Sequence, residues 1–175
     1  MVIKVTQFRD ELADREAIRD CLYRYCRGID RMDAESLASA YWPGALDHHT
    51  GFDGSVEDFI SWALPRLAAM EQGMHMIGNI LIRIEGETAK VESYLWSVSV
   101  LPGESPRRVV TCGRYNDRFE KHDDEWRIAE RWVVHDWYEE VANSGDWDVG
   151  PFGMSGLLRG AVKPLDQSYG WLGLN

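Results

Sequence analysis

The stretch YRYCRGIDRMD, from Tyr23 to Asp33, places an aspartate at the polar end of a predicted helix, and His75 opens a predicted strand further along the chain. An imidazole has an unperturbed pKa of about 6.5, which suits a general base near neutral pH. A carboxylate bonded to one ring nitrogen fixes the tautomer and stabilises the imidazolium that forms. Asp30 and His75 are therefore candidates for a proton-abstracting pair, although a single histidine at a strand start is more often a hydrogen-bonded core or rim residue.

Tyr25 is a third candidate, because a phenol can donate a hydrogen bond to a developing oxyanion. Its separation from Asp30 in sequence corresponds to about 140° around an ideal helix, so the helix by itself does not bring the two together. Core packing and substrate contact both stay open for Tyr25. We expect Arg24, Arg27 and Arg31 of the same stretch to face solvent.

Three predicted helices have to position these residues. Apolar residues at helical spacing predict a helix from Phe8 to Ile29, and Asp33 is suited to cap a short second helix. A third helix is predicted from Val56 to Leu67, with a kink or an early end at Pro65.

The rest of the chain has strand patterns. WPGALDHHTGFDGS, before the third helix, is typical of a strand and a turn. HMIGNILIRIEG and TAKVESYLWSVSVL predict a hairpin that turns at Gly86, and RRVVTCGRYNDRFEKHDDEWRIAERWVVHDW predicts two long strands joined at KHDDE. Helices followed by strands indicate a segregated α+β fold. We expect a cone-shaped α+β barrel, in which three N-terminal helices cross the concave face of a curved mixed or antiparallel sheet.

Composition limits the possible partners. The 175 residues suit one domain, and a net charge of −10 argues against nucleic-acid or anionic-membrane partners. The start lacks an apolar run of signal-peptide type, and no run of about 18 apolar residues occurs, so we expect a cytoplasmic protein. The three cysteines have no close CxxC spacing and are expected to be reduced thiols in the core.

Four segments together resemble the SnoaL-like branch of the nuclear transport factor 2-like superfamily: RYCRGIDRMD, ASAYWPGA, MHMIGN and GRYNDRFEKHDDEWRIAERWVVHDW. The pattern is most similar to scytalone dehydratase, hexachlorocyclohexane dehydrochlorinase and bile-acid dehydratase, over about residues 10 to 140. The resemblance implies a catalytic domain at residues 1–142. It also implies a Gly-rich extension at 143–175, with aromatic residues Trp147, Phe152, Tyr169 and Trp171, packed on the same domain or on a neighbouring subunit.

The resemblance also implies roles, position by position. Asp30 falls on the aspartate that orients the base, His75 on the catalytic histidine, and Tyr25 on a tyrosine that can polarise a carbonyl. His135 lies where the bile-acid enzyme has an arginine, and a neutral imidazole is not a fixed cation. Ser97 stands at about the place of that enzyme's second acid.

The predicted pocket is lined by the last long strand. Alternation puts Arg131, Val133, His135 and Trp137 on one face, and we expect this face to meet the pocket. The candidate substrate contacts are His135, Arg131, Trp42, Tyr115 and His48. Core packing for Trp42 and Tyr115, and a solvated rim for His48, stay open.

These features predict a cofactor-independent lyase without a metal, acting on a hydrophobic, aromatic or polycyclic small molecule. A nicotinamide fingerprint and a P-loop are absent from the sequence. The alternatives are an isomerase or cyclase working through an enolate, and a non-catalytic ligand-binding or structural subunit, such as the β subunit of a ring-hydroxylating dioxygenase. We expect a homotrimer or homodimer, because apolar residues of the last two strands, such as Val110, Trp126 and Trp132, predict more exposed surface than the helices can cover.

Overall fold

The computed structural model describes residues 5–150, 153 and 157–174. Its helices are α1 (Val5–Asp30), α2 (Ala34–Ser39), α3 (Val56–Ala68) and α4 (Ser168–Leu172), and its strands are β1 (Tyr41–His49), β2 (Phe52–Ser55), β3 (Gln72–Glu85), β4 (Thr88–Leu101), β5 (Arg107–His122) and β6 (Glu125–Ala142). One sheet has the order β2-β1-β6-β5-β4-β3, and only β1 and β6 pair in parallel.

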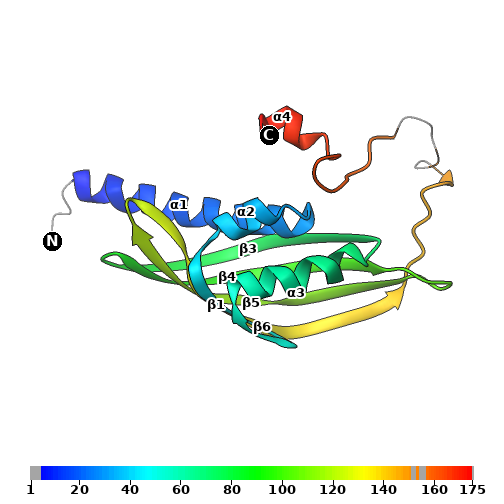
Figure 1. Ribbon diagram of the computed structural model, residues 1–175, viewed down its shortest axis with the longest axis horizontal. Coiled ribbons are helices and arrows are strands. Elements are labelled where there is room, and N and C mark those ends of the chain that lie inside the picture. Colours follow the sequence, from blue (N-terminus) through cyan, green and yellow to red (C-terminus); the bar gives the residue numbers. More distant parts are fainter. Residues whose placement is uncertain (1–4, 151–152, 154–156, 175) are drawn as a thin grey trace.

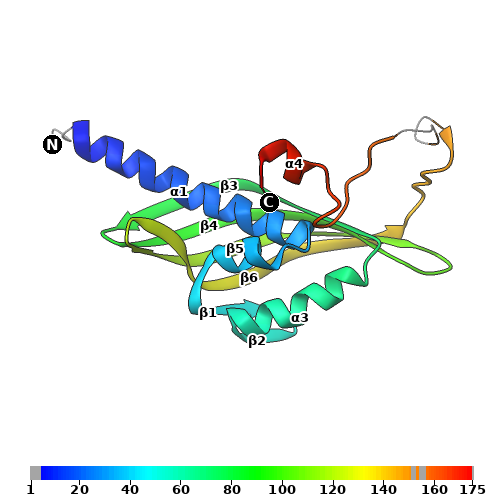
Figure 2. The ribbon, with the colours of Figure 1, turned by 45° about the horizontal axis from the view of Figure 1, so that its top comes forward.

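The first three helices lie on one side of the curved sheet (Figures 1 and 2). The predicted α+β fold with a mixed sheet is therefore confirmed. The expectation of one strand before the third helix was wrong, because the chain reverses at Gly51 (φ +83°) and the segment forms two paired strands. α3 also continues past Pro65 to Ala68, since its Ser55 cap and its buried residues, Val56, Phe59 and Ala63, hold the helix when one backbone donor is lost.

The core lies between α1 and the sheet. The buried face of α1 consists of Ile18, Cys21, Leu22, Tyr25, Cys26 and Ile29. Burial raises the pKa of the Cys21 thiol to about 11 and that of Cys26 to about 12, so both behave as apolar filler. This confirms the prediction for these two cysteines, whereas Cys112 is half-buried.

The junction between α1 and α2 fixes where Asp30 lies. A Cβ at Gly28 would come within 2.6 Å of the Leu37 backbone nitrogen, so only glycine lets α2 pack this closely. Asp33 caps α2, as predicted, by accepting from the Ser36 N–H at 3.1 Å. Between the two helices Met32 is left-handed, with φ +54°.

Both predicted hairpins form, with left-handed residues at Gly86 and at Asp123 and Asp124.

A bulge in β6 changes the predicted face of the last strand. Gly113 pairs with His135, but Cys112 pairs with Trp137, so Asp136 is an extra residue. The expected alternation therefore breaks, and Trp137 does not continue the face of Val133 and His135.

The side chains predicted to make subunit contacts differ in exposure. Trp126 is 2% exposed and Val110 is buried, whereas Trp132 is 52% exposed. In the extension, Tyr169 is buried and Trp171 is 88% exposed, while Phe152 lies outside the described residues.

Among the described helices, none is long and apolar enough to cross a membrane.

Candidate active site

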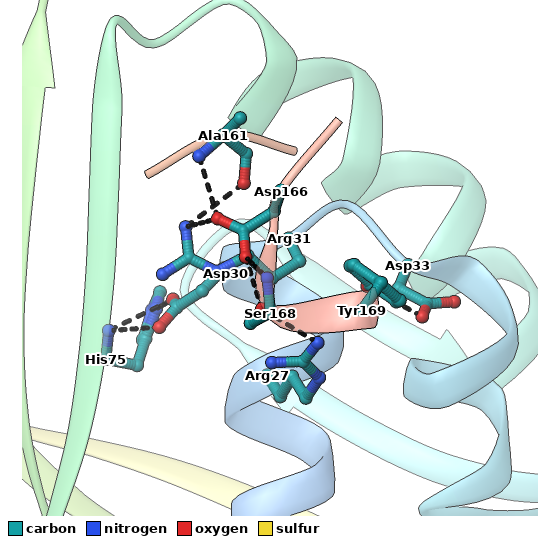
Figure 3. Close-up of polar contacts among 9 residues, drawn as sticks. All are labelled: Arg27, Asp30, Arg31, Asp33, His75, Ala161, Asp166, Ser168 and Tyr169. Atoms are coloured by element: carbon teal, nitrogen blue, oxygen red, sulfur yellow. Dashed lines mark hydrogen bonds and ion pairs between the residues drawn. The ribbon is translucent and has the colours of Figure 1, made fainter. Parts of the chain in front are cut away.

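Asp30 and His75 meet between the end of α1 and the start of β3 (Figure 3). The His75 Nδ1 atom is 2.7 Å from Asp30 Oδ1, and the backbone N–H of His75 donates to both carboxylate oxygens at 3.0 Å. In the described sheet, β3 is an edge strand that pairs with β4 on one side only, and this N–H bonds to Asp30 where a second strand is missing. The same carboxylate thus holds the backbone and the ring of His75 together.

This geometry fixes the chemistry available to the ring. With Nδ1–H donated to a carboxylate, Nε2 is the nitrogen that can accept a proton. Within the described part of the chain, Nε2 makes no hydrogen bond. The side chains are 16% exposed for His75 and 8% for Asp30, so the pair is shielded without being sealed.

Two cavities adjoin the pair, and Asp30 and Arg31 line both. The smaller, of about 340 Å³, is lined by Tyr23, Cys26, Arg27, Asp30, Arg31, His75, Met76 and Ile77. The larger, of about 1010 Å³, is at the upper end of the volumes usual for small-molecule sites. Its apolar lining includes Met32, Leu67, Met70, Met74, Trp96, Val98, Val110, Trp137, Ala161 and Val162.

Tyr25, Tyr115 and Arg131 come together elsewhere, in the closed core. The Arg131 guanidinium carbon lies 4.0 Å from the Tyr25 ring centre and 3.9 Å from that of Tyr115. Its Nε and Nη2 atoms donate to the two oxygens of Asp117, each at 2.7 Å. Arg131 is 0% exposed, and burial raises the pKa of Tyr25 and of Tyr115.

This cluster occupies the face on which the sequence placed the pocket. Neither described cavity beside the dyad is lined by Tyr25, Tyr115 or Arg131. Nη1 of Arg131 is buried and makes no hydrogen bond to a described residue. Cation–π contacts with the tyrosine rings stabilise the guanidinium instead. The structure therefore gives these three residues a packing position.

The remaining predicted contacts lie away from the dyad as well. Trp42 donates from Nε1 to the Glu120 carbonyl at 3.0 Å and stacks on His122. His48 stacks on Trp132, with ring centres 3.8 Å apart. His135 is exposed, and neither cavity beside the dyad includes it.

Sequence reasoning missed the contribution of the helix-end arginines and of the C-terminal segment. Arg31 does not simply face solvent: its Nη1 donates to the Ala161 carbonyl at 3.2 Å and lies 3.7 Å from Asp166. Arg27 lies over the Tyr169 ring at 4.5 Å and donates to the Ser168 hydroxyl. No sequence signal indicates these contacts, because the arginines at the end of the first helix and the aromatic residues of the tail are far apart in the chain and no pattern relates them.

No group of three His, Cys, Asp or Glu side chains suited to a metal ion occurs among the described residues.

A known family matches the part of the chain that contains Asp30 and His75. The model of the SnoaL-like domain matches residues 10–132. The chain belongs to the SnoaL-like family. An uncharacterized Mycobacterium tuberculosis protein, Rv2910c, is 30% identical to this SnoaL-like chain over 125 residues, which cover 69% of this chain and 84% of the relative.

Solved structures share the fold at low sequence identity. A candidate scytalone dehydratase from Novosphingobium aromaticivorans matches with a TM-score of 0.68 and 20% identity, over 75% of this chain and 90% of that protein. The type-3 hexachlorocyclohexane dehydrochlorinase LinA of Novosphingobium barchaimii matches with a TM-score of 0.64 and 17% identity, over 81% and 98%. The structural relatives of this SnoaL-like domain thus include a dehydrochlorinase and a candidate dehydratase.

Proposed function

We propose that this SnoaL-like protein is a cofactor-independent lyase that eliminates water, halide or a small carbonyl fragment from a hydrophobic, aromatic or polycyclic molecule. The observation that carries the proposal is the Asp30–His75 pair, because Nε2 of His75 makes no hydrogen bond to a described residue and His75 lines a cavity. Asp30 lines this cavity and also the larger apolar cavity, so the two cavities adjoin at the pair.

The proposed elimination uses the pair as one unit. To release water or halide, His75 Nε2 takes a proton from a substrate carbon, and the electrons of the broken C–H bond form a double bond as the β-substituent leaves with the electrons of its own bond; with halide, the imidazolium then passes its proton to solvent. To release a small carbonyl fragment, Nε2 instead takes the proton of a substrate hydroxyl group, whose oxygen forms the carbonyl as the adjacent C–C bond breaks, and the electron pair left on the substrate carbon takes the proton back from the imidazolium. The charge of Asp30 stabilises the imidazolium through Nδ1–H. For a hydroxyl leaving group, the imidazolium returns its proton to the departing oxygen, so water is released and the base is regenerated.

Two features support the substrate class. The large cavity combines tryptophan, methionine and aliphatic side chains, which favour an apolar and partly flat ligand. The structural relatives named above carry names of eliminating enzymes, one losing chloride and the other water. At such low identity these names serve as a guide to the screen.

The test is a screen of aromatic and polycyclic alcohols and halides with the full chain, measuring released halide and the mass loss of water. On a substrate that turns over, His75→Ala should lower kcat/KM by about 10²–10⁴-fold with an unchanged circular dichroism spectrum. His122→Ala is the control, because that ring is half exposed beside Trp42 and away from the pair. An active His75→Ala variant would exclude His75 as the base, and solvent deuterium uptake without release would favour the isomerase alternative.

A further inference from the structure

The C-terminal residues 159–169, the strap, run across the end of α1 beside the dyad (Figures 1 and 3). The Lys163 backbone N–H donates to the carbonyl of Arg31 at 2.8 Å, and the Arg31 guanidinium donates back to Ala161. A Cβ at Gly160 would lie 3.3 Å from Arg31 Nη1, so the strap follows this side chain closely. The residue after Asp30 is therefore bonded to the strap through backbone and side chain.

Asp33 is a second anchor. It is 3% exposed and accepts from the Tyr169 hydroxyl at 2.8 Å and from Lys163 Nζ at 3.2 Å, besides its capping bonds to Ser36. Burial would raise the pKa of Asp33, but the hydrogen bonds from Ser36, Tyr169 and Lys163 outweigh burial and lower it to about 2. The anchor is thus charged at neutral pH.

The strap also has order of its own. Asp166 accepts from the backbone N–H groups of Ala161 at 2.9 Å and of Ser168 at 3.0 Å, and from the Ser168 hydroxyl. These bonds lower the pKa of the Asp166 carboxyl. The strap is therefore a turn closed by one carboxylate and held at Arg31 and Asp33, in the junction between α1 and α2.

Part of the strap forms cavity surface. Arg159, Gly160, Ala161 and Val162 line the cavity of about 1010 Å³ that Asp30 also lines. By contrast, Leu165 belongs to the same strap, is 80% exposed and is not part of this lining. Removing residues 159–162 from α1 would open the cavity beside the dyad.

We propose that the strap is a ligand-binding and specificity element: it forms the wall of the large cavity beside Asp30, and the side chains at 161 and 162 set the size of the hydrophobic ligand that fits. Releasing the strap from Arg31 and Asp33 would take this wall away from the cavity. This inference concerns binding and holds whether or not the proposed elimination occurs.

The first experiment titrates the fluorescent probe anilinonaphthalenesulfonate, an aromatic molecule of suitable size, into the full chain and two variants. Ala161→Trp places an indole on the wall and should weaken probe binding by about tenfold or more. Leu165→Trp is the matched control, with the same new side chain on the exposed side of the strap, and should bind like the parent protein. Equal affinities in both variants, or no probe binding to the parent protein, would overturn the proposal.

The second experiment measures hydrogen exchange of the strap amides with and without the probe. The probe should slow exchange at residues 159–163, and the double variant Lys163→Met/Tyr169→Phe should speed both this exchange and probe dissociation by several-fold. Lys121→Met, which removes a lysine paired with Asp14, is the control and should leave the strap unchanged. Strap exchange that is insensitive to the probe would overturn the proposal, and neither readout depends on turnover.

Discussion

Asp30–His75 and Asp117–Arg131 are two acid–base pairs of the same chain with the same closest distance, 2.7 Å. The first lies at a helix end, with side chains 8% and 16% exposed, and borders two cavities. The second has both side chains 0% exposed, and its cation lies over two tyrosine rings.

The difference shows which polar pairs can do chemistry. In the core pair, the arginine is always charged and has no basic nitrogen to offer, so it can only hold its neighbours in place. In the helix-end pair, the carboxylate occupies one ring nitrogen and leaves the other on a surface that a ligand can reach. Close contact alone therefore says little about function, whereas an unbonded basic atom beside a cavity says much.

The largest expected effect concerns the helix-end pair. Asp30→Asn keeps the shape of the carboxylate but removes its charge, so turnover of a substrate should fall by about 10²-fold or more while probe affinity changes little. The double variant Asp30→Asn/His75→Ala should be barely slower than His75→Ala, because the two residues serve one proton transfer. Steady-state kinetics check this, and fully multiplicative losses would mean that the two residues act independently.

Breaking the core pair, Asp117–Arg131, should lower the stability of the fold. Asp117→Ala leaves a buried guanidinium without its carboxylate and should lower the free energy of unfolding by about 3–5 kcal/mol, measured by urea denaturation. Asp136→Ala, which breaks the exposed pair with Arg114, is the control and should have only a small effect. A mild effect of Asp117→Ala would show that the core relaxes around Arg131 or admits water.

The smallest expected effect concerns Asp33, which anchors the strap and belongs to neither pair. The pKa of Asp33 is lowered to about 2 in the folded chain, below its usual 3.8, so its charge stabilises the fold above about pH 4. That contribution is lost as the pH falls toward 2. Asp33→Asn should therefore destabilise the protein by up to about 2 kcal/mol near pH 6 and by less at pH 2.5, in denaturant titrations at both pH values. If Asp33→Asn lowers the free energy of unfolding equally at both pH values, Asp33 does not stabilise the fold through its charge.

Local signals predicted much of the fold. The Asp33 cap, the turns at Gly86 and KHDDE, and the apolar spacing of α1 are short-range patterns, and the structure has each of them. The meeting of Asp30 with His75 was expected from the family resemblance, because no periodicity relates a helix end to a distant strand.

The cavity could not be predicted in the same way. Its surface depends on the extra residue at Asp136, which turns Trp137 away from the face of Val133, and on a tail whose pattern shows no regular period. The core position of Arg131 was missed for a related reason. Side-chain alternation gives the face of a residue but not what packs over that face.

The large cavity extends across the boundary of the SnoaL-like match. Residues 10–132 contain both acid–base pairs, whereas Trp137, Trp147 and the strap residues 159–162, which also line the large cavity, all come after that segment. The segment that matches the family and the segment after it therefore meet at one cavity. Substitutions on the cavity side of the tail, at Ala161 or Val162, can therefore change the shape of the cavity while the contacts between Asp30 and His75, which lie within the matched segment, stay in place.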